Sequence, residues 1–408
     1  MKIIAFVILL ISLSAHSQIE KKVCFLGNSY TYTNDLPKLI SDLADADGNT
    51  LVKDQNTPGG YTLEGHSSNA TSLSKIASNN WDFVVLQDQS QLPSFPWEQV
   101  TEDVFPYGEI LSDSIRSANE CAVPLFFNTW GRRDGDDQWD SINTFTKMNQ
   151  RLYTAYSYMA DKNSGMLAPA GIGFEHIAND GTAPITHSSL YVGDGSHPSV
   201  YGSYLAACIF YEVIFEENSE GNTFYPGAIS ATTANYIQTV AHHVLTEVDS
   251  ITIDYTTPVA LFNVAYDGTT ASFTNTSEHA FEFFWEFGDG ATSTEENPVH
   301  IYADLDEYTV TLTATYCDKS STVTGGTDHT EIKENELLLF TLFPNPSVNG
   351  TFTIRYSGGY SPLHIFSLDG QLVIDSFIHN EAKFELPQGI YFIKIGAITK
   401  KLVVNGVM

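Results

Sequence analysis

Two stretches far apart in the chain carry side chains suited to acyl transfer. Ser29 follows an apolar run, residues 23–26, on a Gly-Asn-Ser turn, and Asp194 stands three residues before His197. A serine hydroxyl is a weak nucleophile until a neutral imidazole takes its proton, and a carboxylate can fix the imidazole tautomer. These residue types predict a catalytic triad with Ser29 as nucleophile, His197 as base and then acid, and Asp194 as the orienting carboxylate.

Each half also has a simpler explanation. Ser and Asn are favoured at helix N-caps and turns, and Asp-x-x-His before a helix can be a cap followed by a surface histidine. The triad is favoured because one α/β sheet would bring the two stretches together.

The flanking sequence indicates the elements that position these residues. After Ser29, apolar residues recur at helical spacing, so the serine lies between a strand and a helix, where backbone N–H groups favour an oxyanion. After His197, Pro198 suits a first helical position. A core-facing stripe then follows: Tyr201, Tyr204, Leu205, Cys208 and Ile209.

Short apolar strands alternate with helical stretches through this region, which is typical of a parallel sheet covered on both faces. Residues 23–26, 83–86 and 124–128 are predicted strands, and residues 167–171 lead towards another. Ligands bind beyond the carboxyl ends of such strands. The fold class predicted is therefore α/β with a pocket at that edge.

These motifs resemble those of the SGNH/GDSL hydrolases over roughly residues 20 to 218, in a branch that reads Gly-Asn-Ser in its first block. The matching positions are Gly27-Asn28-Ser29, Gly59-Gly60, Asp194-x-x-His197-Pro-Ser and Gly202-Ser-Tyr-Leu. The resemblance implies a flavodoxin-like fold. It also implies an oxyanion hole built from the nucleophile N–H, a second-block glycine N–H and a third-block asparagine.

The third block departs from the family pattern. Where the family has Gly-x-Asn-Asp, this chain has Gln87-Asp88-Gln89-Ser90. A glutamine amide is the same donor on a longer arm, so the predicted donors are the N–H groups of Ser29 and Gly60 and the side chain of Gln89, with Gln87 as second choice. The alternative is that the oxyanion hole is weakened and catalytic activity is lost.

Three further residues are candidates for the substrate pocket: Asn28, His66 and Trp130. Trp130 could stack on a sugar ring or cover the sheet. His66 could lie near the pocket or on the surface.

Composition sets limits on partners. The chain has 408 residues, which predicts two or three domains, and a formal charge of −30 from 49 acidic and 19 basic residues. Nucleic-acid and anionic-membrane partners are disfavoured because phosphate binding needs basic clusters. Neutral sugars remain compatible.

Cysteine and histidine spacing indicates neither a disulfide framework nor a metal site. Four cysteines are too few for a framework; Cys24 and Cys208 are predicted to be buried, and Cys121 and Cys317 fall in different predicted domains. No zinc-type spacing occurs, residues 134–137 indicate a solvated turn, and no cofactor is expected.

Residues 1–17 have the features of a signal peptide, with Lys2, an apolar run and a small-residue cleavage site. No later apolar run approaches the ~18 residues of a membrane span, so an exported protein without membrane insertion is predicted. The hydrolase domain is predicted over residues 20–252.

Two β modules are predicted to follow. Residues 256–328, with Trp285 and a Gly288-Asp289-Gly290 turn, resemble a PKD domain of immunoglobulin-like fold. Residues 336–408 resemble a type A sorting domain of the type IX secretion system. That resemblance implies passage through this secretion machinery, removal of the domain, and a secreted or cell-surface product.

The function predicted is a secreted serine esterase acting on O-acyl esters, with O-acetyl groups of a polysaccharide as the expected substrate; the sugar preference rests on family analogy and export. Two alternatives stay open. One is a non-catalytic carbohydrate-binding or adhesive surface protein that keeps the hydrolase fold. The other is a lipase or thioesterase.

Overall fold

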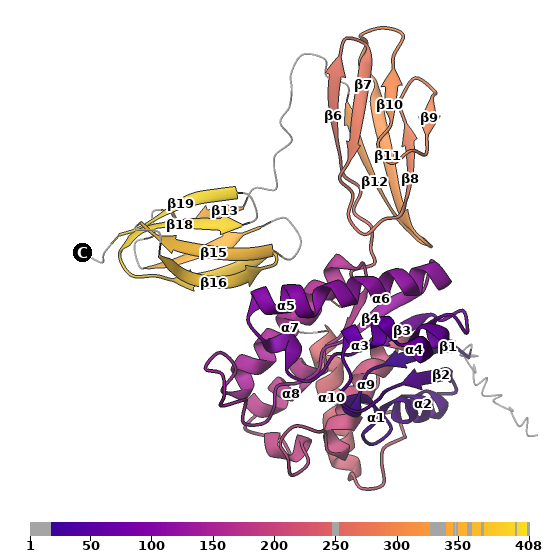
Figure 1. The fold of residues 1–408 in the computed structure, drawn as a ribbon, viewed down its shortest axis with the longest axis vertical. Helices are drawn as coiled ribbons and strands as arrows, with labels where there is room; N and C mark the ends of the chain where they lie inside the picture. The colour runs from indigo at the N-terminus through magenta and orange to yellow at the C-terminus, as the bar shows by residue number, and fades with distance from the viewer. Residues whose placement is uncertain are drawn as a thin grey trace, which may run out of the picture.

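The computed structural model describes residues 18–246, 253–326, 340–345, 347, 350–356, 361–368, 371–395 and 398–405. The predicted signal peptide, residues 1–17, lies outside them. Figure 1 shows an α/β domain followed by two all-β bodies.

The α/β domain is built on a parallel sheet of five strands in the order β2-β1-β3-β4-β5. The strands are β1 (Glu20–Leu26), β2 (Thr50–Asn56), β3 (Phe83–Leu86), β4 (Val123–Phe127) and β5 (Met166–Ala168). This order is flavodoxin-like and places a ligand-binding crevice near β1 and β3, where the strand order reverses. The predicted fold class is confirmed.

Helices cover both faces of the sheet because the strands are apolar on both sides (Figure 1). One face carries α2 (Leu36–Ala46), α8 (Ala170–Asn179), α9 (Val200–Phe215) and α10 (Ala231–Thr246). The other carries α3 (Leu63–Ser68), α4 (Ala70–Ile76), α5 (Trp97–Asp103), α6 (Phe105–Ala118) and α7 (Phe145–Lys162). Two short 3-10 turns, η1 (Leu92–Ser94) and η2 (His187–Leu190), lie in the loops.

Helix α9 is buried on almost every side and contains Cys208, which is buried and unbridged as predicted, like Cys24 in β1. It begins two residues later than expected. Ser199 is the N-cap, since its hydroxyl accepts the N–H groups of Tyr201 and Gly202, so Pro198 precedes the helix.

The second body is a sandwich of two antiparallel sheets, β10-β7-β6 and β12-β11-β8-β9. Its strands are β6 (Phe262–Asp267), β7 (Thr270–Asn275), β8 (Glu282–Glu286), β9 (Thr292–Ser293), β10 (Val299–Ile301), β11 (Thr309–Tyr316) and β12 (Lys319–Gly326). Trp285 is fully buried in its core, and Asp289 bonds His300 and the N–H of Ala291, so both residues are structural.

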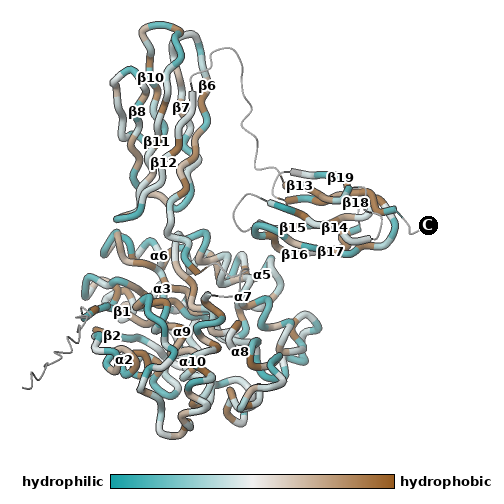
Figure 2. The backbone as a smooth tube through the Cα atoms, turned by 180° about the vertical axis from the view of Figure 1, so that it is seen from behind, coloured by the Kyte–Doolittle hydropathy of each residue, from teal (hydrophilic) through white to brown (hydrophobic). Residues whose placement is uncertain are grey.

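The third body is also antiparallel, with sheets β13-β14-β17 and β16-β15-β18-β19. Its strands are β13 (Thr341–Phe343), β14 (Thr351–Arg355), β15 (Ser361–Ser367), β16 (Leu372–Ile378), β17 (Glu381–Glu385), β18 (Gly389–Ile395) and β19 (Ile398–Val404). Apolar residues alternate along these strands into one core, and Figure 2 shows this body apart from the second.

The junction between the first two bodies holds a disulfide that the sequence did not predict, Cys121–Cys317. The two cysteines lie 196 residues apart and gave no spacing signal. Near this junction, Tyr255 donates a backbone hydrogen bond to Gly165 and Leu167 donates one to Ile253, so the chain leaving the α/β domain pairs beside β5.

Within the described parts of the chain, each helix is too short or too polar to cross a membrane.

Candidate active site

The structure brings the three predicted triad residues into one hydrogen-bonded chain at the carboxyl edge of the sheet. Ser29 begins α1 (Ser29–Tyr32) directly after β1, and its Oγ lies 2.8 Å from Nε2 of His197. Nδ1 of His197 lies 2.6 Å from Oδ2 of Asp194. The serine and histidine are 168 residues apart in sequence, so the fold alone creates this contact.

Asp194 is held as an ionised acceptor. Although partial burial works against the charge, hydrogen bonds from the N–H of Ser196 and from His197 keep the pKa of Asp194 below its ordinary value. Its Oδ1 accepts the N–H groups of Ser196 and His197 at 2.9 and 3.0 Å, which leaves Oδ2 for the imidazole. A carboxylate placed in this way orients the ring and stabilises an imidazolium.

Stacked aromatic rings contact the loop that carries His197. The ring of Tyr30 stacks on Trp130 at 4.9 Å, and Trp130 stacks on Phe174 at 4.2 Å. The hydroxyl of Tyr30 lies 2.7 Å from Oγ of Ser196, and Nε1 of Trp130 donates to the carbonyl of Ser196 at 3.1 Å. We call Tyr30 and Trp130, with their hydrogen bonds to Ser196, the Ser196 clamp, because they hold the residue just before His197.

Trp130 is therefore a core residue and not a sugar platform. Its side chain is fully buried between two rings, so no face is open to substrate. Of the two roles predicted for it, covering the sheet is the one that its burial allows.

Of the two positions predicted for His66, the structure excludes the surface and puts the residue beside the turn that carries Ser29. It is fully buried, with Nε2 3.0 Å from the carbonyl of Gly27 and Nδ1 2.8 Å from Oγ of Ser72. Burial lowers the pKa of His66 to about 4, so the ring is neutral at pH 7. It braces the turn before the serine and has no surface for substrate.

Asn28 is also buried, and its side chain ties the serine turn to two other segments. Its Nδ2 donates to the carbonyl of Tyr61 at 2.8 Å and to the carbonyl of Asp88 at 3.1 Å. Tyr61 follows Gly60, and Asp88 precedes Gln89. An aspartate could not donate these bonds, which gives a physical reason for Gly-Asn-Ser in place of Gly-Asp-Ser.

The side chain of Gln87 pairs with Asn28, and its amide N–H groups are already used within the protein. Its Oε1 accepts the N–H of Asn28 at 2.8 Å and the hydroxyl of Thr31 at 3.0 Å. Its Nε2 donates to Oδ1 of Asn28 at 2.9 Å and to the carbonyl of Asp88. This second choice for an oxyanion donor is therefore excluded in the observed arrangement.

Gln89 differs from Gln87 in one decisive respect. Its Oε1 accepts the N–H groups of Gln91 and Leu92 at 2.7 and 3.2 Å, which fixes the orientation of the amide. Its Nε2, like the N–H groups of Ser29 and Gly60, has no hydrogen-bond acceptor among the residues that the structure describes. The three predicted donors thus remain unused by the protein.

Asp88 is a buried carboxylic acid that the sequence reasoning did not single out. Its Oδ1 accepts the N–H groups of Leu63 and Gln89 at 3.2 and 2.6 Å, while Oδ2 lacks a partner within residues 18–246 and 253–326. Burial raises the pKa of Asp88 to about 7. The signal was present, since a polar residue directly after a buried strand lies at the ligand edge of a parallel sheet.

The acidic turn at residues 134–137, predicted to be solvated, is so only in part, because Asp136 is buried. Asp136 accepts hydrogen bonds from Gln91 and Arg132, and Asp134 pairs with Arg133. Over the described ranges, no group of three His, Cys, Asp or Glu side chains is arranged to hold a metal ion.

Family models match three parts of the chain. Residues 59–244 match the domain of unknown function DUF4886, residues 258–333 match the PKD domain, and residues 341–405 match the secretion system C-terminal sorting domain. The predicted PKD and sorting modules are confirmed, and the sorting domain indicates type IX secretion to the medium or cell surface. The α/β domain resembles the SGNH hydrolases, as predicted.

Three solved structures illustrate what the α/β domain is similar to. A DUF4886 family protein from Bacteroides uniformis is 20% identical, covers 57% of this chain and 98% of its own, with a TM-score of 0.49. A protein assigned as an SGNH hydrolase from Slackia heliotrinireducens is 27% identical, with 47% and 98% covered and a TM-score of 0.39. An acetyl xylan esterase from Geobacillus stearothermophilus is 12% identical, with 52% and 99% covered and a TM-score of 0.36. No curated protein matches this chain.

Proposed function

We propose that this protein is a secreted serine esterase that hydrolyses O-acyl esters, with O-acetyl groups of a polysaccharide as its substrate. The observation that carries the proposal is the continuous chain from Ser29 Oγ through His197 to Asp194, with contacts of 2.8 and 2.6 Å. The sorting domain places the product outside the cell, where polysaccharide esters are accessible.

The first half of the reaction acylates the enzyme. Ser29 Oγ attacks the ester carbonyl carbon while Nε2 of His197 takes the hydroxyl proton, and Asp194 stabilises the imidazolium. The N–H groups of Ser29 and Gly60 and the Nε2 of Gln89 bind the oxyanion. The carbon–oxygen bond to the sugar then breaks as His197 returns its proton to the leaving alcohol.

The second half releases the acid. Water replaces the sugar, His197 takes one of its protons, and the resulting hydroxide equivalent attacks the acyl carbon. The bond to Ser29 Oγ breaks, and His197 reprotonates this oxygen. One ester and one water yield one alcohol and one carboxylic acid, with the residues restored.

The test is hydrolysis of p-nitrophenyl acetate and acetate release from acetylated polysaccharides by the purified chain. Ser29→Ala should lower kcat at least about 10³-fold, because the residual rate comes only from binding and the oxyanion donors. The exposed Ser68 provides the matched control Ser68→Ala, which should leave the rate unchanged. Equal slow turnover by wild type and Ser29→Ala would favour the non-catalytic binding protein.

A chain-length series separates the esterase from the lipase or thioesterase. The proposal expects kcat/KM to fall from acetate through butyrate to octanoate esters. A rise towards octanoate would contradict the acetyl preference while leaving the triad chemistry in place.

A further inference from the structure

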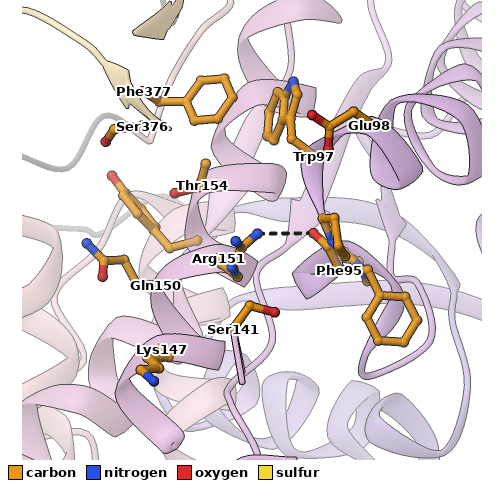
Figure 3. Close-up of a pocket in the computed structure, with 13 residues that line it drawn as sticks. Phe95, Trp97, Glu98, Ser141, Lys147, Gln150, Arg151, Thr154, Ser376 and Phe377 are labelled. Carbon is orange, nitrogen blue, oxygen red and sulfur yellow. Dashed lines mark hydrogen bonds between the residues drawn. The ribbon is translucent and has the colours of Figure 1, made fainter. Parts of the chain in front are cut away.

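A cavity that none of the triad residues lines lies between the α/β domain and the sorting domain. It has a volume of about 440 Å³, within the range of about 300–1,000 Å³ usual for small-molecule sites. Its walls come from the segment after η1, from α7, and from β16 (Figure 3). Its lining includes Phe95, Trp97, Lys147, Arg151 and Phe377.

Two cations line this cavity, and neither has a carboxylate partner among the residues that the structure describes. Lys147 and Arg151 lie one helical turn apart on α7. Lys147 Nζ donates to the carbonyl of Asp140 at 3.0 Å and to Oδ1 of Asn143 at 2.9 Å, and Arg151 donates to the carbonyl of Phe95 at 3.3 Å. All three acceptors are neutral.

These two neighbouring cations line one cavity in a chain with 49 acidic and 19 basic residues. Some other cations of the α/β domain form ion pairs, as Lys75 does with Asp54 and Arg132 does with Asp136. Among the described residues, neither Lys147 nor Arg151 has such an ion pair, and one acidic side chain, Glu98, lines the cavity with them. The cavity therefore suits an anionic ligand.

The aromatic wall indicates what kind of anion fits. Trp97 is packed edge-on by Phe105 and Tyr158, at 4.8 and 5.2 Å, and this support fixes its ring. Phe377 of the sorting domain packs on the same indole, with the ring centroids 3.8 Å apart, and Figure 3 shows the two side chains next to each other. The indole of Trp97 thus accepts a flat ring from outside its own domain.

We propose that this cavity binds a uronic acid residue of an acidic polysaccharide. The pyranose ring packs on Trp97 where Phe377 now lies, and the carboxylate takes paired hydrogen bonds from Arg151 and a charge contact from Lys147. While the sorting domain is attached, Phe377 competes with the sugar ring for Trp97 and weakens binding. Removal of that domain ends this competition.

The cavity is joined to the proposed catalytic site by one short segment. Gln89 accepts the N–H groups at the start of η1, and the cavity wall begins at Pro93 and runs to Trp97. A polymer anchored here lies along the same edge of the sheet as Ser29. Binding itself does not rest on the proposed esterase activity, so it can be measured without turnover.

The experiment is isothermal titration of the full chain carrying Ser29→Ala, with trigalacturonate as ligand and maltotriose as the neutral trimer. Trigalacturonate should bind, and Phe377→Ala should tighten binding about tenfold by uncovering Trp97. Arg151→Gln and Trp97→Ala should each weaken it about tenfold or more. Lys53→Gln, at an exposed lysine outside the cavity, is the matched charge control and should have no effect.

Three results would overturn the proposal: equal binding of maltotriose, equal binding of a tetra-aspartate peptide, or no binding by the Phe377→Ala chain. If Phe377→Ala does not fold, the comparison of Arg151→Gln with Lys53→Gln in the chain that retains Phe377 decides the matter. A wild-type chain that hydrolyses p-nitrophenyl acetate, while its Ser29→Ala form binds no trigalacturonate, would refute this site and leave the esterase intact.

Discussion

The two halves of the triad are held by different means. The serine turn is surrounded by buried polar groups, with Asn28 2% and Gln87 0% exposed, and each makes several internal hydrogen bonds. The histidine loop lies near the surface, where the side chains of His197 and Asp194 are 37% and 48% exposed. Substitutions around Ser29 should therefore lower both stability and activity. Substitutions around His197 should lower activity alone, because they misalign the imidazole.

The largest effect is expected for Asn28→Asp. The substitution replaces two N–H donors with carboxylate oxygens that face the carbonyls of Tyr61 and Asp88. An uncompensated buried charge should lower the free energy of unfolding by about 3–5 kcal/mol, and esterase activity should be lost. Urea unfolding measures the first quantity. Asn80→Asp, at an exposed asparagine, should change stability by less than about 0.5 kcal/mol.

If Asn28→Asp kept full stability, the amide network around the serine would not hold the turn in place. The contrast between the two halves would then be wrong.

Gln89→Ala should lower kcat by about 10²–10³-fold, because it removes one oxyanion donor. The free energy of unfolding should fall by less than for Gln87→Ala, because Gln89 is only half-buried, although the N–H groups of Gln91 and Leu92 lose their acceptor. Gln87→Ala is the informative comparison: it leaves buried partners unsatisfied and should cost about 1–3 kcal/mol in unfolding free energy. A drop of less than a few-fold for Gln89→Ala would remove this residue from the proposed oxyanion hole.

The raised pKa of the buried Asp88 should make the stability of the fold depend on pH. Its pKa is about 7 in the folded chain against an ordinary 3.8, so the folded state binds the extra proton between these values. Stability should fall as pH rises from about 4 to 7, on the order of 4 kcal/mol, and then level off. Asp88→Asn should flatten this slope in thermal unfolding scans. An unchanged slope would mean that another group titrates.

The smallest effect is expected for Tyr30→Phe, which removes the hydroxyl that contacts Ser196 and keeps the stack on Trp130. We expect kcat to fall about tenfold with KM unchanged, because a loosened His197 misaligns the proton transfer without altering binding. Ser196→Ala should have the same effect, and the double variant should add nothing. An equal loss of stability and activity would show that the Ser196 clamp is merely structural.

Sequence pattern predicted the sheet well where strands are continuous apolar runs. The bounds of β3 agree with the predicted 83–86, because a short buried strand has a clear composition. The choice between Gln87 and Gln89 could not be made in this way. Both are polar residues at the end of one strand, and only the hydrogen-bond partners of each amide distinguish them.

The positions of Trp130 and His66 could not be predicted from the sequence for the same reason. Their residue types suit both a pocket and a core, and burial is decided by rings and carbonyls from distant segments, such as Phe174 and Gly27. The pairing of Cys121 with Cys317 has a similar origin, since it depends on how two domains meet and not on any local spacing.

The cross-link at that junction has a consequence for the fate of the exported product. Cys121 and Cys317 both precede residue 336, where the sorting domain is predicted to begin, so trimming of the tail leaves the bond intact. A protease that nicked the chain between α10 and β6 would yield two fragments that still migrate together on a non-reducing gel. The PKD module is thus kept with the hydrolase-like domain even after the polypeptide between them is severed.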